Sequence, residues 1–144
     1  MDRAKNIAEQ ITWLVPKLLR GLRAGFIGFP QVTTSQVVTL MSIYEKNTIR
    51  VGNLSKEMHV SPPTITGVVD RLVRGGYLRR THDKQDRRAV NVELTNKGKR
   101  LVENFLSEIN KRWYGILRRL TEEERENYLR ILKRIVEILV KENT

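Results

Sequence analysis

The sequence predicts a mainly α-helical fold of six helices with a small sheet of two or three strands. Apolar residues recur at three- and four-residue spacing over most of the 144 residues, as in amphipathic helices. One stretch, from Tyr77 to Leu94, instead shows the alternation of strands around a polar tip. Side chains that cap helices precede several of the helical stretches. Hydrophobic residues make up 40% and charged residues 30% of the chain, which is typical of a globular protein.

The N-terminal part predicts two helices separated by an apolar loop. A helix is expected from Asp2 to about Arg23, with a kink at Pro16, because proline lacks the N–H that the helix needs. The loop over residues 25–30 is unusually apolar and is expected to pack beneath a neighbouring element or a partner chain. Residues 33–36 offer capping side chains for a second helix that stops near Asn47.

The middle of the chain predicts two short helices joined by a tight turn. A very short strand is expected at residues 48–50 and a helix at residues 54–58. The turn places His59 where a left-handed backbone is needed. Ser61 then caps a further helix, which the two glycines at residues 75–76 bring to an end.

The remainder predicts a β-hairpin and two long helices. Strands are expected at residues 77–82 and 89–94, on either side of the polar tip. Thr95 caps a long helix, and residues 121–124 (TEEE) form the capping box of the last one.

Two short helices followed directly by a hairpin predict a winged helix-turn-helix. The free face of the second helix carries mostly small residues, so it can enter a major groove about 12 Å wide. Hydroxyls there can contact base edges, and a thymine methyl group can pack on the two prolines. The candidate DNA-binding residues of this helix are Ser61, Pro62, Pro63, Thr64, Thr66, Arg71 and Arg74.

The hairpin supplies a second set of candidate DNA contacts, namely Arg80, Lys84, Arg87 and Arg88. Asp86 is expected to pair within the tip, which leaves Arg87 to reach the minor groove. The alternative is a solvated cluster of surface salt bridges.

The charge of the chain supports a polyanionic partner. The net charge is +11, and 13 Lys and Arg face 5 Asp and Glu between Lys46 and Arg100, against 14 and 11 in the remainder. We expect double-stranded DNA as the partner, bound either by a sequence-specific regulator or by a sequence-tolerant architectural protein. RNA fits less well, because its deep major groove excludes a helix.

Several function classes are disfavoured by residues that the chain lacks. It has no cysteine, which excludes disulfides and thiol chemistry. Its two histidines, His59 and His82, form no pattern typical of a catalytic triad or a metal site, so we expect neither an enzyme nor a cofactor. Without an apolar run long enough to span a bilayer, or a signal peptide, a cytoplasmic location is expected.

Two motifs between residues 68 and 98 resemble the MarR family of multiple-antibiotic-resistance-type regulators. They are VVDRLVRGGYLRR at residues 68–80 and DKQDRRAVNVELTNKG at residues 83–98. The resemblance covers essentially the whole chain and implies a homodimer of winged helix-turn-helix subunits, in which Ser35 and Gln36 touch phosphate. Residues 1–32 and 96–144 are expected to form the dimerisation region, and residues 33–95 the DNA-binding lobe. The Pro62-Pro63 pair departs from the family, which more often carries polar residues there.

The resemblance also implies a repressor that a small aromatic anion relieves. The expected ligand-binding residues are Trp13, Arg20, Arg23, Tyr44 and Trp113. The chain has more apolar side chains in its terminal helices than one small core needs, which independently predicts a dimer. The candidates for an intermolecular core are Trp13, Phe26, Phe29, Leu106, Ile109, Trp113, Ile138 and Leu139.

Overall fold

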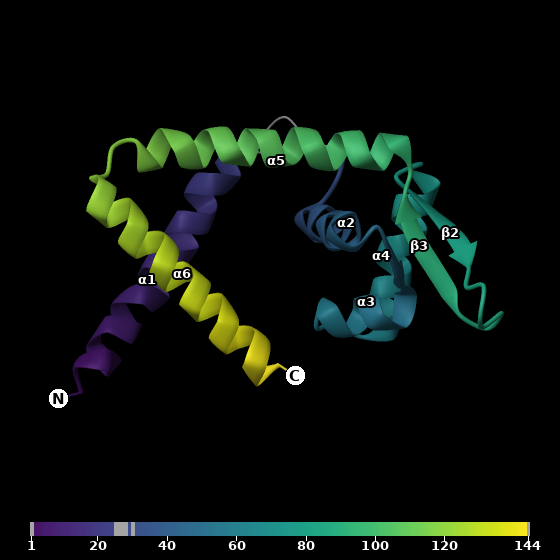
Figure 1. Ribbon diagram of the computed structural model, residues 1–144, viewed down its shortest axis with the longest axis horizontal. Coiled ribbons are helices and arrows are strands. Elements are labelled where there is room, and N and C mark those ends of the chain that lie inside the picture. Colours follow the sequence, from purple (N-terminus) through teal and green to yellow (C-terminus); the bar gives the residue numbers. More distant parts are fainter. Residues whose placement is uncertain (1, 25–28, 30, 144) are drawn as a thin grey trace. The chain divides into compact units, whose positions relative to one another are not determined.

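The computed structural model describes residues 2–24, 29 and 31–143, and in this part the predicted order of elements is confirmed (Figure 1). The helices are α1 (Arg3–Arg23), α2 (Thr34–Lys46), α3 (Val51–Glu57), α4 (Pro62–Arg74), α5 (Asn96–Leu117) and α6 (Glu122–Glu142); the strands are β1 (Thr48–Arg50), β2 (Leu78–His82) and β3 (Val90–Leu94). The chain forms two compact units, one up to Glu108 and one from Ile109 onwards.

The predicted caps determine where most helices begin. The Ser61 side chain accepts a hydrogen bond from the Thr64 N–H at the start of α4. Thr33 with Gln36 forms a complete capping box at α2. Thr121 forms another at α6, while Thr95 Oγ1 accepts from the Gly98 N–H at the start of α5. These contacts satisfy backbone N–H groups that have no partner within the helix.

Two turns depend on left-handed backbone. His59 has φ of 53°, which confirms the prediction for the turn between α3 and α4. Asn47, at the end of α2, also has a positive φ, of 64°, which the sequence analysis missed. Asn is among the few non-glycine residues that adopt this conformation readily.

α1 spans the residues predicted for it, whereas α3 begins earlier than predicted. α1 continues as one helix through Pro16. α3 begins at Val51, three residues before the predicted start, because β1 runs directly into it. Its N-cap, Arg50, makes no side-chain capping bond, so the sequence carries no capping signal there.

The three strands form an antiparallel sheet in the order β1-β3-β2. Val92 of β3 lies between Ile49 of β1 and Arg80 of β2. The sheet and α2 to α5 enclose one core, whose fully buried members include Leu40, Ile43, Leu54, Ile65, Leu72, Val92 and Val102. Of the apolar loop, only Phe29 is among the described residues, and its ring meets Phe105 edge-on at 5.7 Å. Phe26 lies outside them.

The terminal helices α1 and α6 contain no buried residue and so contribute none to this core. Trp13 is 76% exposed, and Ile138 and Leu139 are about half exposed. Phe29 and Leu106, by contrast, pack against the core of the first unit. Within the described residues, no helix is long and apolar enough to cross a membrane.

Candidate nucleic-acid interface

α4 is held by one apolar face and presents the other to solvent. Ile65, Val68, Val69 and Leu72 are buried, at the spacing of one helix face. The residues from Ser61 to Thr64 and Thr66 are exposed. This division places the predicted DNA-facing residues of α4 on an accessible surface.

The hydroxyl groups on this surface are already engaged within the helix. Ser61 Oγ and Thr64 Oγ1 lie 2.7 Å apart and share a hydrogen bond. Thr66 Oγ1 donates to the carbonyl oxygen of Pro62 at 2.9 Å. Of the three hydroxyl protons, one therefore remains to be donated elsewhere.

Arg71 and Arg74 lie in the last turn of α4 and carry its positive charge. A Cβ atom added to Gly67 would lie 3.8 Å from Arg71 Nη2, so this guanidinium extends back beside Gly67. Gly67 has no side chain, so the middle of the exposed face of α4 does not protrude. A helix face without a protruding side chain, and with a cation beside it, can approach a groove of DNA closely.

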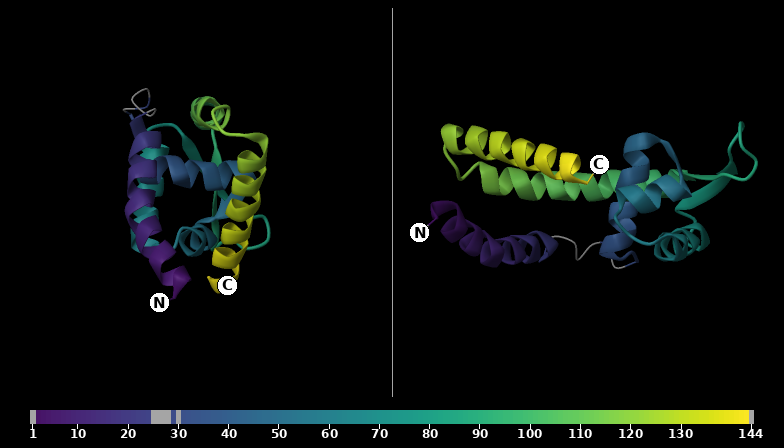
Figure 2. Two further views of the ribbon diagram at one scale, coloured as in Figure 1. Left: turned by 90° about the vertical axis from the view of Figure 1, so that its left-hand side faces the viewer. Right: turned by 90° about the horizontal axis from the view of Figure 1, so that it is seen from below.

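The β2–β3 hairpin forms the wing and projects from the helices of the same unit (Figure 2). Asp86 Oδ1 accepts from the Arg88 N–H at 2.9 Å, and the Asp86 carbonyl accepts from the Ala89 N–H. The internal pairing predicted for Asp86 is thus present, with backbone groups as its donors. Lys84, Arg87 and Arg88 are exposed around this ordered tip.

Two ion pairs join the wing to the helix-turn-helix. Arg50 donates through Nε and Nη2 to Asp83 Oδ2, at 3.0 and 2.8 Å. Arg80 of β2 pairs with Asp70 of α4. The β2 arm of the hairpin is therefore tied at two points, to α4 through Arg80 and to the start of α3 through Asp83.

The contacts of Asp83 lower the pKa of its carboxyl group. The N–H of Gln85 donates to it and makes the largest contribution, and the hydrogen bond from Arg50 follows. Both favour the ionised form. Sequence reasoning missed the role of Arg50, because nothing in its local sequence marks it as a partner of Asp83.

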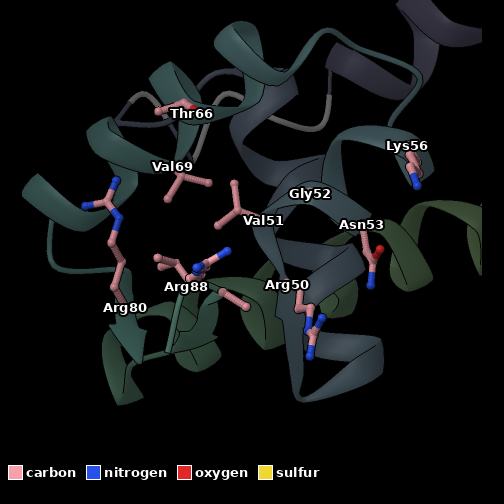
Figure 3. A pocket seen from close by; sticks show the side chains of 11 residues that line it. Arg50, Val51, Gly52, Asn53, Lys56, Thr66, Val69, Arg80 and Arg88 are labelled. Carbon is pink, nitrogen blue, oxygen red and sulfur yellow. The ribbon is translucent and has the colours of Figure 1, made fainter. Parts of the chain in front are cut away.

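A cavity of about 550 Å³ opens between α3, α4 and the wing (Figure 3). Val51 and Val69 give it an apolar wall. Its charged lining residues are Arg50, Lys56, Arg80 and Arg88. Arg50 and Arg80 are paired, whereas Lys56 and Arg88 line the cavity with no ion pair among the described contacts. The two cations without an ion pair, Lys56 and Arg88, give this hollow a positive potential that attracts phosphate.

Sequence reasoning also missed Lys56. Its position on α3, well before the predicted recognition helix, gave no reason to place it near the wing. Arg88 does line the cavity, while Arg87 is not among its lining residues.

The two predicted contact residues of α2 have other roles as well. The Gln36 side chain accepts from the Thr33 N–H at 2.9 Å, and the Ser35 carbonyl accepts from Thr39 Oγ1. Backbone N–H groups at the start of α2 can still face an anion. A phosphate contact here stays a prediction.

The five predicted ligand-binding residues are not joined to one another by any contact described for them. Tyr44 OH donates to Glu103 and lines a cavity of about 430 Å³, which Arg79 and Lys99 also line. Arg23 Nη2 donates to Thr34 Oγ1. The Trp113 ring lies 5.8 Å from that of Tyr128. Trp13 and Arg20 are exposed on α1.

No cluster of three acidic, histidine or cysteine side chains that could hold a metal ion occurs among the described residues. The exposed side chains of this surface are cations and small groups, which can bind phosphate and contact base edges.

This geometry defines a class: a winged helix-turn-helix protein with a cationic wing beside an accessible recognition helix. The family model named MarR family matches residues 32–90, which is the lobe just described. The chain is 31% identical over 110 residues to YfiV of Bacillus subtilis, an uncharacterised HTH-type transcriptional regulator, covering 74% of this chain and 69% of YfiV. The chain belongs to the MarR family.

Two further comparisons describe the relatives. YetL of Bacillus subtilis, an HTH-type transcriptional repressor, is 30% identical over 102 residues. That match covers 69% of this chain and about three-fifths (61%) of the length of YetL. The crystal structure of FabT from Streptococcus pneumoniae in complex with DNA superposes with a TM-score of 0.80 at 25% identity, covering 96% of this chain and 98% of FabT. YetL and YfiV are named as transcriptional regulators and not as enzymes.

Proposed function

We propose that this protein is a transcriptional regulator that binds a palindromic site in double-stranded DNA as a homodimer and represses transcription. The observation that carries the proposal is the exposed face of α4 beside a wing with three exposed cations at its tip. FabT, which was crystallised with DNA, and YetL, which is named a repressor, support it as relatives.

We assign the DNA contacts to three groups. Ser61, Pro62, Pro63, Thr64, Thr66, Arg71 and Arg74 would face the major groove, and Ser35, Gln36, Arg80, Lys84 and Arg88 the phosphates. Arg87 would enter the minor groove, because it is exposed on the tip and does not line the cavity.

A dimer follows from the apolar surfaces of α1 and α6. Half-exposed apolar side chains such as Ile11, Leu132 and Val136 are costly to leave in water in such numbers. A twofold assembly would cover them and present two recognition helices to half-sites about 34–36 Å apart. We assign dimerisation to residues 1–32 and 96–144 and DNA binding to residues 33–95.

We infer that a small aromatic anion relieves repression. Family membership supports this, as does the presence of arginines and aromatic rings among Trp13, Arg20, Arg23, Tyr44 and Trp113. A ligand that binds the DNA-free form better would lower DNA affinity by the same factor by which DNA lowers ligand affinity. Thermal unfolding with salicylate-like acids tests it: a rise in Tm supports an effector site, and no rise with any such acid overturns it.

Selection of bound sequences from a random pool of double-stranded DNA tests the main proposal. One enriched palindrome, protected in footprinting and resistant to competition by unrelated DNA, is the expected result. Uniform coating of DNA without enrichment would instead indicate an architectural protein. Absence of DNA binding would overturn both.

A variant pair sharpens the test. Arg87→Ala should weaken binding to the selected site, whereas Lys17→Ala on α1 removes the same charge outside the proposed lobe and should not. Equal effects of the two would show that only net charge matters.

A further inference from the structure

The first turn of α4 offers DNA an apolar surface. Pro62 and Pro63 stand at its first two positions, exposed and without a polar side-chain atom. Val60, just before the Ser61 cap, is also 37% exposed. Acidic residues are favourable in the first turn of a helix, and this turn has none.

The polar groups next to this surface are largely engaged in hydrogen bonds within the helix. The Thr66 hydroxyl donates to the Pro62 carbonyl, and the Ser61 and Thr64 hydroxyls bond to each other. Asp70, the acidic residue of α4, is paired with Arg80. The first two turns are therefore poorly equipped to distinguish bases by hydrogen bonds, although hydrogen bonds are the usual means.

One feature of a base edge in the major groove is apolar: the 5-methyl group of thymine. We propose that the first turn of α4 selects thymine through contact of this methyl group with Pro62 and Pro63, so that each half-site contains thymine where this turn lies. This inference rests on the proposed function. The cations in the last turn of α4, Arg71 and Arg74, hold the helix in the groove by charge.

Deoxyuridine differs from thymidine by this methyl group alone and provides the test. In the DNA selected from the random pool, each thymine is replaced by uracil in turn, in both half-sites. At the positions under the first turn, affinity should fall about fourfold per methyl group, or about sixteenfold for a symmetric pair. Replacing T·A there by C·G should also weaken binding, and 5-methylcytosine should restore part of the loss.

Two variants connect the effect to the prolines. Pro63→Ser and Pro62→Ser keep the Ser61 cap and should lose most of the preference for thymine over uracil. Arg74→Ala should lower the affinity for both DNAs and leave their ratio unchanged. Circular dichroism and thermal unfolding establish that each variant is folded.

Equal affinity for thymine and uracil DNA at every position would overturn the inference, while the selected palindrome would still uphold the proposed function. A thymine preference that persists in both proline variants would also overturn it. Failure of the selection itself would overturn the proposed function first.

Discussion

Arg50 and Asp83 are separated by 33 positions in the sequence, yet the Nη2 of Arg50 lies 2.8 Å from Oδ2 of Asp83. Arg50 is the last residue of β1 and the N-cap of α3, and Asp83 is the first residue after β2. The pair therefore links the beginning of the helix-turn-helix to the point where the tip of the wing begins. We consider it a device that positions the wing.

Variants of this pair separate positioning from charge. Arg50→Gln removes a positive charge and Asp83→Asn a negative one, so a purely electrostatic effect would move DNA affinity in opposite directions. We expect both single variants to bind DNA more weakly than the parent protein. The double variant should bind DNA no more weakly than the weaker-binding single variant, because each substitution breaks the same contact. Binding isotherms at fixed salt measure this, and opposite shifts would contradict a positioning role.

The same pair predicts a pH dependence. Because the folded-state pKa of Asp83 lies below its ordinary value, its contribution to stability is fully present above about pH 3.9 and is lost as the pH falls through the lower folded value. NMR titration of the carboxyl group should show this low midpoint. In Arg50→Gln the midpoint should rise, but only part of the way, because the Gln85 N–H still donates. An unchanged midpoint would show that Arg50 does not hold the carboxylate in solution.

Gly98→Ala should destabilise the protein. A Cβ atom at Gly98 would overlap the Tyr77 carbonyl oxygen, which is backbone and cannot move aside cheaply. Overpacking of this kind costs about 1–3 kcal/mol, seen as a lower Tm. Gly52→Ala in α3 is the matched control: its Cβ would meet nothing within 4 Å, so the stability should stay the same or rise slightly. Similar losses in both variants would contradict the close approach at Gly98.

DNA binding should depend steeply on salt. If the dimer neutralises about six to ten phosphates, the slope of log K against log salt concentration is about −5 to −9. Lys84→Ala should make it shallower by about 2, one phosphate contact being lost in each subunit. Lys17→Ala should leave it unchanged. A nearly flat slope in the parent protein would exclude the phosphate contacts.

Leu132→Glu should separate the proposed dimer. Leu132 lies on the apolar face of α6, and an unpaired carboxylate buried in an interface costs about 3–5 kcal/mol, a rise of a hundredfold or more in the dimer dissociation constant. Arg130→Glu introduces the same side chain at an exposed polar position of α6 and should leave the dimer intact. Sedimentation would show the difference, and a monomeric parent protein would refute the assembly.

Asp70→Asn should raise affinity for unrelated DNA. Asp70 neutralises Arg80 at the surface, so its loss adds one free cation per subunit near the phosphates. The stability should change little, because exposed ion pairs contribute about 0–1 kcal/mol. Competition assays with selected and unrelated DNA should show a smaller ratio of affinities, and an unchanged ratio would assign Asp70 a merely structural role.

The sequence alone determined the elements and their order. Apolar spacing and the capping residues Ser61, Thr95 and Thr121 are local signals, because a helix begins where nearby side chains satisfy its first N–H groups. The outward residues of α4 followed from the same periodicity. The early start of α3 escaped prediction because Arg50 caps it without a side-chain bond, and its position depends on the pairing of β1 with β3.

Only the tertiary structure decided which cations meet and which polar groups are free. Arg50 and Lys56 reach the wing because the sheet and α3 bring distant segments together, and no local pattern encodes that distance. The sequence left hydroxyl contacts and methyl contacts equally open at the first turn of α4. The side-chain conformations of Ser61, Thr64 and Thr66 favour the second, because two of their three hydroxyl protons are already donated within the helix and cannot also be donated to a base.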